Sequence, residues 1–306
     1  MTLPESRYTI QRMEKDFTRT AARALLPPRP DDGHKGTFGH VFVIGGARGY
    51  SGAVIMAALA AGRSGVGLVT VGVPRPLGDI VSGHLLTGMT RMLDATPAES
   101  IAREAVEPAL EFARGKDAVV LGPGLSQHPD TQAFALEFVR RCPVPMLIDA
   151  DGLNALATAV DTLKRVQAPV VLTPHPGEMA RLVGGSTQDV LKDRTRTAVY
   201  FAERFGCTLV LKGRRTLVAH AGEVFANTTG NSGMATGGTG DVLSGIIGGL
   251  MAQGMAPRDA ALLGVYAHGL AGDLAAADKT RRGLIATDLI DYLPLAWQRL
   301  EGDENV

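Results

Sequence analysis

The residues whose types and spacing best suit catalysis lie between positions 227 and 254. Gly237, Gly238 and Gly240 come directly before Asp241, and apolar residues then recur at the spacing of an amphipathic helix. This pattern predicts a glycine loop that ends at a helix N-terminus. Unpaired backbone N–H groups and the positive end of the helix dipole stabilise an anion at such a point, above all a phosphate. The stretch is therefore expected to bind phosphate.

Asp241 stands at the start of that helix, where its carboxylate would repel a phosphate. Two interpretations are open. As a helix N-cap, Asp241 would accept hydrogen bonds from orphan N–H groups and contribute roughly 0.5–2 kcal/mol of stability. As a catalytic base, it would take the proton of an attacking hydroxyl while the backbone donors hold the developing negative charge.

Other polar residues follow apolar runs that are typical of strands. Asp149 and Asp151 flank such an end in IDADGLN, where two carboxylates could hold Mg²⁺ or cap the next helix. His175 lies between two prolines that stiffen its backbone, so a ligand contact and a structural role are both open for it, whereas the other six histidines are expected to be structural. Lys212 ends an apolar run at a glycine, from which its ammonium could reach phosphate oxygens or simply face solvent.

Two familiar nucleotide-binding motifs are weak or absent in the sequence. Gly46, Gly49 and Gly52 follow a β-branched run, but without a G-x-G pair they are typical of a tight turn rather than a dinucleotide fingerprint. The Gly-Lys pair at positions 115–116 is followed by Asp117 instead of Ser or Thr. A P-loop enzyme is therefore excluded.

Composition limits the partners and the compartment. Lys plus Arg and Asp plus Glu both total 31 among 306 residues, and this balance favours neither nucleic acid nor a membrane surface as a partner. No stretch approaches the roughly 18 uninterrupted apolar residues of a membrane span, and the N-terminus has no apolar signal region, so we expect a cytoplasmic protein. Cys142 and Cys207 fit no metal or redox spacing and are expected to be reduced, buried thiols.

The elements that must position these residues alternate along the chain. Strands are expected at 40–46, 67–74, 117–124, 145–152, 169–176, 207–213, 215–222 and 223–229. Helices are expected at 12–25, 53–63, 98–113, 131–140, 153–160, 177–183, 187–205, 259–277 and 287–300, besides the one that starts near 241. Segments 207–213 and 215–222 are too close for a crossover helix, so they predict an antiparallel hairpin.

This order predicts a doubly wound α/β fold with a mostly parallel sheet, helices on both faces and a late antiparallel hairpin. Residues 1–34, which are proline-rich near their end, are expected to be a lead-in to one domain over residues 35–306. Ligands of such sheets bind at the carboxyl ends of the strands. The polar and glycine-rich segments named above would line that edge.

The ordered motifs KGTFGHVFVIGG, SGA, GPGL, DADGLN, TPHPGE, LKGxxT and GNSGMATGGTGDVLSGIIG together resemble the ADP-dependent NAD(P)H-hydrate dehydratases. The similarity runs from Lys35 to the C-terminal helix and implies a ribokinase-like fold. It implies repair of (6S)-NADHX and NADPHX, in which water has added to the nicotinamide ring. In the family's reaction ADP phosphorylates the ring hydroxyl and phosphate then leaves, giving NAD(P)H, AMP and phosphate. Mg²⁺ is implied by the nucleotide chemistry, with no ligands assigned.

The same resemblance implies roles for single residues. Asp241 would be the catalytic base, and the substrate contacts would be Ala53, Gly124, His175 and Asp241. The nucleotide contacts would be Lys212, Gly213, Arg214, Arg215, Thr216, Gly238, Thr239 and Gly240. The chain departs from the expected family pattern at Arg214 and Arg215, where smaller residues are expected.

Two other functions are weighed against this one. A small-molecule kinase of the same fold, such as a hydroxymethylpyrimidine or hydroxyethylthiazole kinase, would leave phosphate on its product, but the PHPGE and SGA segments argue against it. A non-catalytic nucleotide sensor would bind ADP without turnover. The resemblance also implies a homo-oligomer, a tetramer by family resemblance. Residues 1–34 are too short for the epimerase domain of many relatives, so either a separate NAD(P)HX epimerase is a further partner or only one epimer is repaired.

Overall fold

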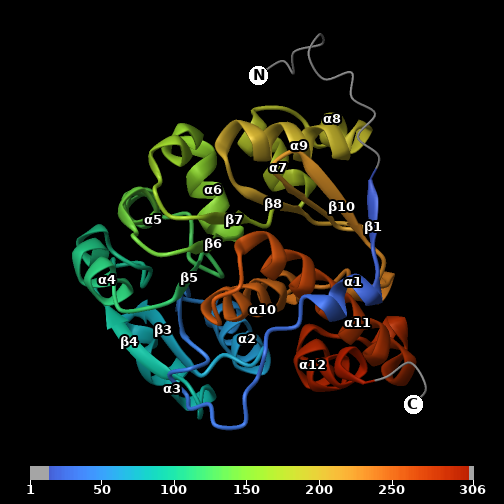
Figure 1. Cartoon of the computed structure of the whole chain (residues 1–306). Coiled ribbons are helices and arrows are strands. Elements are labelled where there is room, and N and C mark those ends of the chain that lie inside the picture. Colours follow the sequence, from blue (N-terminus) through green and yellow to red (C-terminus); the bar gives the residue numbers. More distant parts are fainter. Residues whose placement is uncertain (1–13, 303–306) are drawn as a thin grey trace.

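A sheet of ten strands forms the centre of the computed structural model, which describes residues 14–302 (Figure 1). The strand order across the sheet is β1-β10-β9-β8-β7-β6-β5-β2-β3-β4. The strands are β1 (Lys15–Phe17), β2 (His40–Ile44), β3 (Leu68–Pro74), β4 (Met89–Leu93), β5 (Ala118–Leu121), β6 (Met146–Ile148), β7 (Val170–Leu172), β8 (Thr208–Leu211), β9 (Leu217–His220) and β10 (Glu223–Asn227).

Within residues 14–302, β9 is the one strand that runs against its neighbours, because it pairs antiparallel with both β8 and β10. This confirms the predicted late hairpin. The strand order reverses between β2 and β5, which lie side by side and parallel. In doubly wound folds a reversal of this kind opens a crevice at the carboxyl ends of the two strands.

The helices connect these strands and cover the sheet. The α-helices are α1 (Arg19–Ala24), α2 (Ser51–Arg63), α3 (Gly78–His84), α4 (Val106–Ala113), α5 (Pro129–Arg141), α6 (Ala150–Thr158), α7 (Pro176–Val183), α8 (Thr187–Lys192), α9 (Arg194–Phe205), α10 (Thr239–Ala252), α11 (Pro257–Gly283) and α12 (Ala286–Glu301). Short 3₁₀ helices are η1 (Arg75–Leu77), η2 (Arg103–Ala105), η3 (Val160–Arg165) and η4 (Ser232–Met234).

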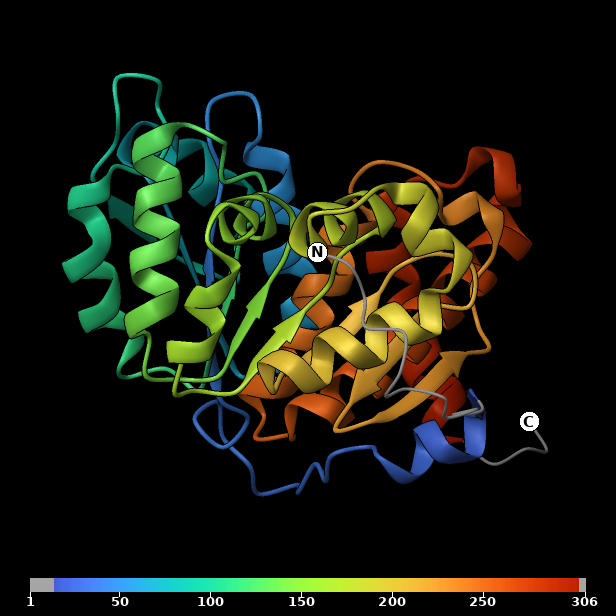
Figure 2. The ribbon, with the colours of Figure 1, turned by 90° about the horizontal axis from the view of Figure 1, so that it is seen from above.

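Side chains that alternate along each strand feed two separate hydrophobic cores. Val41 and Val43 of β2 join a core with α2, α10, α11 and α12, whereas Phe42 and Ile44 join a core with α4 to α7 and α9. The two helix groups lie on opposite faces of the sheet (Figure 2). The expected doubly wound arrangement is therefore confirmed.

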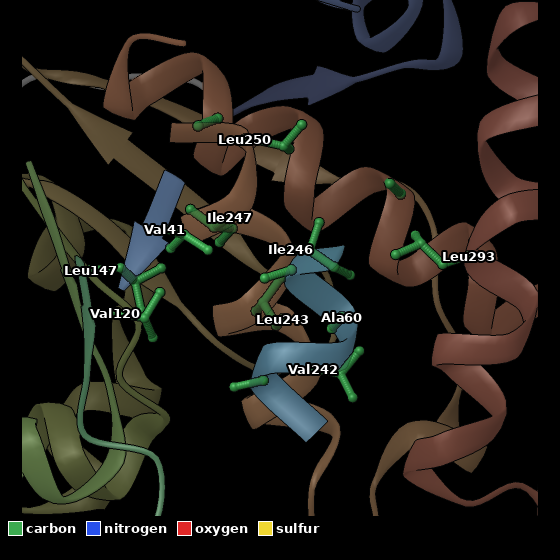
Figure 3. Packing of buried hydrophobic residues seen from close by; sticks show 14 of the residues in the cluster. Val41, Ala60, Val120, Leu147, Val242, Leu243, Ile246, Ile247, Leu250 and Leu293 are labelled. Carbon is green, nitrogen blue, oxygen red and sulfur yellow. The ribbon is translucent and has the colours of Figure 1, made fainter. Parts of the chain in front are cut away.

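Helix α10 packs against α2 and the sheet with almost no side chain between the backbones. A Cβ atom on Gly245 would lie 2.0 Å from the Ala57 carbonyl oxygen, and one on Gly248 would lie 2.1 Å from Val120 Cγ2. A Cβ atom on Gly249 would lie 2.0 Å from Ser64 Oγ. Figure 3 shows apolar residues of the sheet and of α10 packed around these contacts. The glycines thus bring the N-terminus of α10 close to the sheet.

Some elements differ from the sequence prediction. The described part of the helix expected over 12–25 contains β1 followed by the short α1, and β4 was not expected at all. Both strands lie at the edges of the sheet, and β1 finds its partner, β10, about two hundred residues later, through pairs such as Lys15 and Phe225. The helix expected over 187–205 is divided into α8 and α9 because Asp193 leaves helical geometry and caps α9.

Two expectations about apolar residues can be compared with the fold. Cys142 and Cys207 are free and buried as expected, and burial raises the pKa of their thiols to about 11 and about 12. Among the described helices, α11 is long and apolar enough to cross a membrane by length and composition alone. Of its most apolar window 67% is buried inside the molecule, as in a core helix.

Candidate functional site

The carboxyl ends of β2 and β5 bring together two residues expected to contact a substrate. The loops that follow these strands touch, since the Gly46 N–H donates to the Pro123 carbonyl at 2.9 Å. Gly124 has a positive φ of 61°, and a Cβ atom there would lie 3.1 Å from the Cβ of Ala53 and 2.5 Å from the Tyr50 carbonyl oxygen. Only glycine fits this position, so Ala53 and Gly124 form one small surface.

Lys212 lies at the end of β8 in a buried ion pair. Its Nζ is 2.7 Å from Asp149 Oδ1 and 3.8 Å from Glu178 Oε2, with only 19% of the Lys212 side chain exposed. Ser244 of α10 donates to the other Asp149 oxygen at 2.7 Å. Burial lowers the pKa of Lys212, but Asp149 and Glu178 more than offset this, and the net shift is upward. Lys212 is therefore a fixed cation rather than a solvated surface charge.

The N-terminus of α10 lies directly over this cation. Gly238, at a φ of 93°, occupies the N-cap position, and Asp241 is in the first helical turn without a capping hydrogen bond. The N-cap interpretation of Asp241 is therefore wrong. A Cβ atom on Gly240 would lie 3.3 Å from Lys212 Nζ and 3.8 Å from Asp149 Oδ2. The absence of a side chain at Gly240 leaves a space bounded by the helix N-terminus and an ammonium.

Asp241 itself is partly buried among charged groups. The pKa of its carboxyl is raised to about 7, chiefly by burial; the carboxylates of Asp149, Asp151 and Glu178 add to this increase, and Lys212 opposes it. A carboxyl with a pKa near 7 exchanges protons readily at neutral pH, which is what a general base requires. The electrostatics of the site thus suit the catalytic interpretation of Asp241.

His175 begins α7 and forms a reciprocal capping box with Glu178. Its Nδ1 accepts from the N–H groups of Gly177 and Glu178 at 3.0 and 3.2 Å, while Glu178 accepts from the His175 N–H at 2.8 Å. Burial and the charge of Lys212 lower the pKa of His175, whereas burial raises that of Glu178 to about 7. In the neutral ring the proton must be on Nε2, because Nδ1 is an acceptor. The Nε2 donor of the half-exposed ring lies 3.4 Å from Glu178 Oε1, and it is the atom that the predicted ligand contact would use.

The predicted nucleotide contacts at residues 212–216 form a tight loop between β8 and β9. Thr216 Oγ1 donates to the Gly213 carbonyl at 3.0 Å and closes the loop. Arg215 has a positive φ of 52° and its side chain pairs with Asp16 of β1. The Arg215 side chain thus binds the edge strand, whereas that of Arg214 is exposed. Thr239, in the other loop, is used internally, donating to the Met234 and Thr236 carbonyls at 3.0 and 3.1 Å.

The two aspartates that were considered as magnesium ligands have different surroundings. Asp149 is bound to Lys212 and Ser244, as described above. Asp151 accepts from the Ser126 N–H at 2.9 Å and from Asn154 Nδ2 at 3.1 Å, so it stabilises the loop after β5. Among residues 14–302, no group of three or more His, Cys, Asp or Glu side chains is arranged to hold a metal ion.

Several residues of the site were missed or assigned a purely structural role from sequence. Ser244 lies nearly one helical turn after Asp241, a spacing that places both near one face of α10 and was an available signal. His268 of α11 donates from Nε2 to the Thr239 carbonyl at 2.9 Å, and burial lowers its pKa to about 4, so the ring is neutral. Asp273 accepts from the Gly230 N–H at 2.8 Å. Helix α11 thus holds the glycine loop.

A model of one protein family, described as NAD(P)H-hydrate dehydratase, matches residues 41–295 of the chain. A bifunctional NAD(P)H-hydrate repair enzyme of Moorella thermoacetica is 44% identical over 98% of this chain, which covers 57% of that enzyme. The chain thus spans little more than half the length of this curated relative.

Two other relatives are matched over almost their whole length. A Bacillus subtilis protein named ADP-dependent (S)-NAD(P)H-hydrate dehydratase is 34% identical over 93% of this chain and 98% of its own length. A crystal structure of the ADP/ATP-dependent NAD(P)H-hydrate dehydratase of Bacillus subtilis, co-crystallised with ATP and Mg²⁺, matches with a TM-score of 0.82 and 31% identity, over 94% of this chain and 99% of that one. The expected ribokinase-like fold is therefore confirmed.

Proposed function

The chain belongs to the NAD(P)H-hydrate dehydratase family, and we propose that it converts (6S)-NADHX and NADPHX back to NADH and NADPH at the expense of ADP. The Bacillus subtilis relative is named for the (S)-hydrate and for ADP, which supports this choice of substrate and phosphoryl donor. Water is a poor leaving group and phosphate a better one, so phosphorylation of the ring hydroxyl allows the elimination.

The observation that carries this proposal is the meeting of three groups at the space beside Gly240. The Lys212 ammonium follows β8, whereas the Asp241 carboxyl lies in the first turn of α10, so two distant segments bring the ammonium, the helix N-terminus and the carboxyl together. Two of these groups stabilise negative charge and the third can accept a proton. That combination fits the attack of a hydroxyl on a phosphoryl group.

In the proposed mechanism, the hydrate lies over Ala53 and Gly124, with its ring hydroxyl near Asp241. The Asp241 carboxylate takes the hydroxyl proton as the oxygen bonds to the β-phosphorus of ADP, and AMP leaves. Loss of phosphate from the ring carbon, with a proton from the neighbouring carbon, then restores the ring double bond. His175, a neutral donor at Nε2, would orient the substrate at the edge of the site.

Developing negative charge on the phosphoryl group would be held by Lys212 and by backbone donors. Within the described residues, the N–H groups of Gly238, Thr239, Gly240 and Asp241 donate to no other group. Asp149 fixes the Lys212 ammonium at 2.7 Å, and Ser244 in turn fixes Asp149. Fixed donors of this kind stabilise a transition state without reorganising during the reaction.

The donor set of the site fits Mg²⁺ that is bound together with the nucleotide. Mg²⁺ usually keeps several waters and touches the protein through one or two carboxylates besides substrate phosphates. Asp149 and Glu178 supply such oxygens beside Lys212 and would hold the ion. When bound, Mg²⁺ would neutralise phosphate charge and favour departure of AMP.

The test is recovery of the reduced-nicotinamide absorbance band from chemically hydrated NADH. Purified protein with Mg²⁺ and ADP should restore the band and release inorganic phosphate, whereas a control without nucleotide should not. A small-molecule kinase would leave the phosphate on its product, and a nucleotide sensor would bind ADP without turnover. Either result would reject the proposed reaction.

Partners beyond the two substrates are also proposed. An NAD(P)H-hydrate epimerase would supply the (S)-hydrate for which the Bacillus subtilis relative is named. The exposed apolar side chains of Ile80, Leu86, Met89 and Met92, around the edge strand β4, support a homo-oligomer. Size-exclusion chromatography with light scattering would test this assembly.

A further inference from the structure

Arg194, the first residue of α9, is bound to the loop between β8 and β9 rather than to another side chain. Its Nη1 donates to the Arg214 carbonyl at 2.7 Å, and its Nη2 donates to the Leu211 carbonyl at 3.1 Å and to the Arg215 carbonyl at 3.5 Å. A Cβ atom on Gly213 would lie 3.3 Å from Nη2, so the loop passes closely over the guanidinium. One side chain therefore contacts the loop at both ends and near its middle.

These contacts occupy most carbonyl groups of the loop and leave its N–H groups open. The carbonyls of Leu211, Arg214 and Arg215 accept from Arg194, and that of Gly213 accepts from Thr216. Within the part of the chain that the structure describes, the N–H groups of residues 213–216 donate to no group. A loop with satisfied acceptors and open donors favours an anionic ligand.

The geometry of the peptide unit explains why occupied carbonyl groups and open N–H groups occur together in this loop. In a trans peptide unit the C=O and N–H bonds point in opposite directions. The unit that joins Leu211 to Lys212 illustrates this, since its carbonyl accepts from Arg194 while its N–H donates to the Pro174 carbonyl at 2.9 Å. By binding the carbonyls of Arg214 and Arg215, Arg194 likewise turns the N–H groups of Arg215 and Thr216 away from itself.

The conformation that results is one the loop would not adopt by itself. Gly213 has a φ of 141° and Arg215 a φ of 52°, a left-handed conformation that is unfavourable for a residue with a side chain. Such geometry persists only where the surroundings determine it. The surroundings of Arg215 are Arg194 on its carbonyl and Asp16 on its side chain.

We propose that Arg194 is the positioning residue of the nucleotide site, which holds the 212–216 loop with its N–H groups open to the phosphates of ADP. This inference rests on the proposed function only for the identity of the nucleotide. Lysine cannot replace Arg194, because a single ammonium does not present the fork of donors that reaches separate carbonyls.

The test compares Arg194→Ala and Arg194→Lys with the control Arg204→Ala. Arg204 lies on the same helix, is exposed and donates to Tyr200 within that helix at 2.9 Å. ADP binding is measured by isothermal titration calorimetry without the hydrate. We expect both Arg194 variants to bind ADP about tenfold or more weakly, because the competent loop is then a minor conformation, and the control to bind normally.

Kinetics separate positioning from a general loss of structure. In the Arg194 variants KM for ADP should rise by the same factor, while KM for the hydrate and kcat at saturating ADP stay within about threefold of the parent values. Equal losses for both substrates would overturn the proposal, as would recovery of ADP binding in Arg194→Lys, which would indicate a simple charge effect.

The behaviour of the parent protein separates the proposed dehydratase reaction from the proposed positioning role of Arg194. Binding of ADP without turnover of the hydrate would reject the proposed reaction, yet loss of that binding in the Arg194 variants would still support the positioning role. Absence of ADP binding in the parent protein would overturn the assignment of this loop, and with it the role of Arg194.

Discussion

Within residues 14–302, two loops at the proposed site have backbone N–H groups that donate to no other group, and the two loops are held in different ways. The glycine loop before α10 is fixed to α11 at several points, through Asp273, through His268 and through Asn231, whose Nδ2 donates to the Gly272 carbonyl at 3.0 Å. The 212–216 loop depends largely on Arg194. The contrast indicates that several side chains of comparable weight hold the glycine loop, whereas Arg194 supplies most of the side-chain contacts to the carbonyls of the 212–216 loop.

The largest effect is expected where the glycine loop supplies the chemistry itself. Asp241→Asn should bind ADP normally but reduce turnover by about 10²-fold or more, the scale of a lost general base. The measurements are calorimetric ADP binding and recovery of the reduced-nicotinamide band. Near-normal turnover in this variant would remove Asp241 from the reaction and leave the glycine loop as a binding element only.

Lys212 lies between the two loops, and its removal should weaken the binding of the nucleotide more than that of the hydrate. Lys212→Ala should raise KM for ADP by about tenfold or more, and KM for the hydrate by less, because the ammonium faces the phosphoryl site. The variant should also melt at a lower temperature, since removal of one partner of a buried ion pair costs about 3–5 kcal/mol. A larger effect on the hydrate than on ADP would place Lys212 outside the nucleotide site.

The pH dependence should follow the carboxyl of Asp241, whose pKa is raised to about 7. Its basic form falls about tenfold per pH unit below that pKa, so kcat/KM should decline steeply toward pH 5. The effect of pH on folding stability is opposite to that of an ion-paired carboxylate. The folded state binds the Asp241 proton more tightly than the unfolded chain does, so the contribution of this carboxyl to stability falls as pH rises.

Stability contributed by Asp241 is therefore present below pH ~4 and is lost as pH rises toward ~7. In Asp241→Asn that part of the loss should disappear from chemical unfolding curves recorded over this range. An unchanged pH profile of stability in the variant would show that the carboxyl titrates normally in the folded state.

The smallest effect is expected at a single anchor of the glycine loop. Asp273→Asn keeps one acceptor oxygen, and the contacts of His268 and Asn231 remain, so ADP affinity should change by less than about threefold. Calorimetry in parallel with Arg194→Ala makes the comparison direct. Equal losses in the two variants would abolish the distinction between a redundant and a singly held loop.

The sequence predicted those parts of the fold whose signals are local. Apolar β-branched runs gave the central strands, and the short spacing between 213 and 215 gave the hairpin. The strands β1 and β4 were missed because each lies at an edge of the sheet and has few buried side chains. Their pairing is determined by distant partners, which local patterns do not contain.

The site residues likewise fall into those with a local sequence signal and those whose surroundings depend on distant segments. Predicted contacts such as Ala53 and Gly124 converge because they follow strand ends, and a parallel sheet gathers those ends at one edge. The burial of Lys212 could not be foreseen, since Asp149 lies 63 residues earlier. Arg194 gave no signal, because an arginine at the start of a helix is common and its acceptors are backbone carbonyls.

The glycines of α10 have a consequence for how this sequence can vary. Gly245, Gly248 and Gly249 carry no functional atom, yet a single methyl group at any of them would meet a neighbour at about 2 Å. At Gly245 the neighbour is the backbone carbonyl of Ala57, so relief of that overlap would move α10, which carries Asp241, relative to α2. Substitutions at these three glycines would therefore be selected against because of the close packing of α10, although none of the glycines takes part in the reaction.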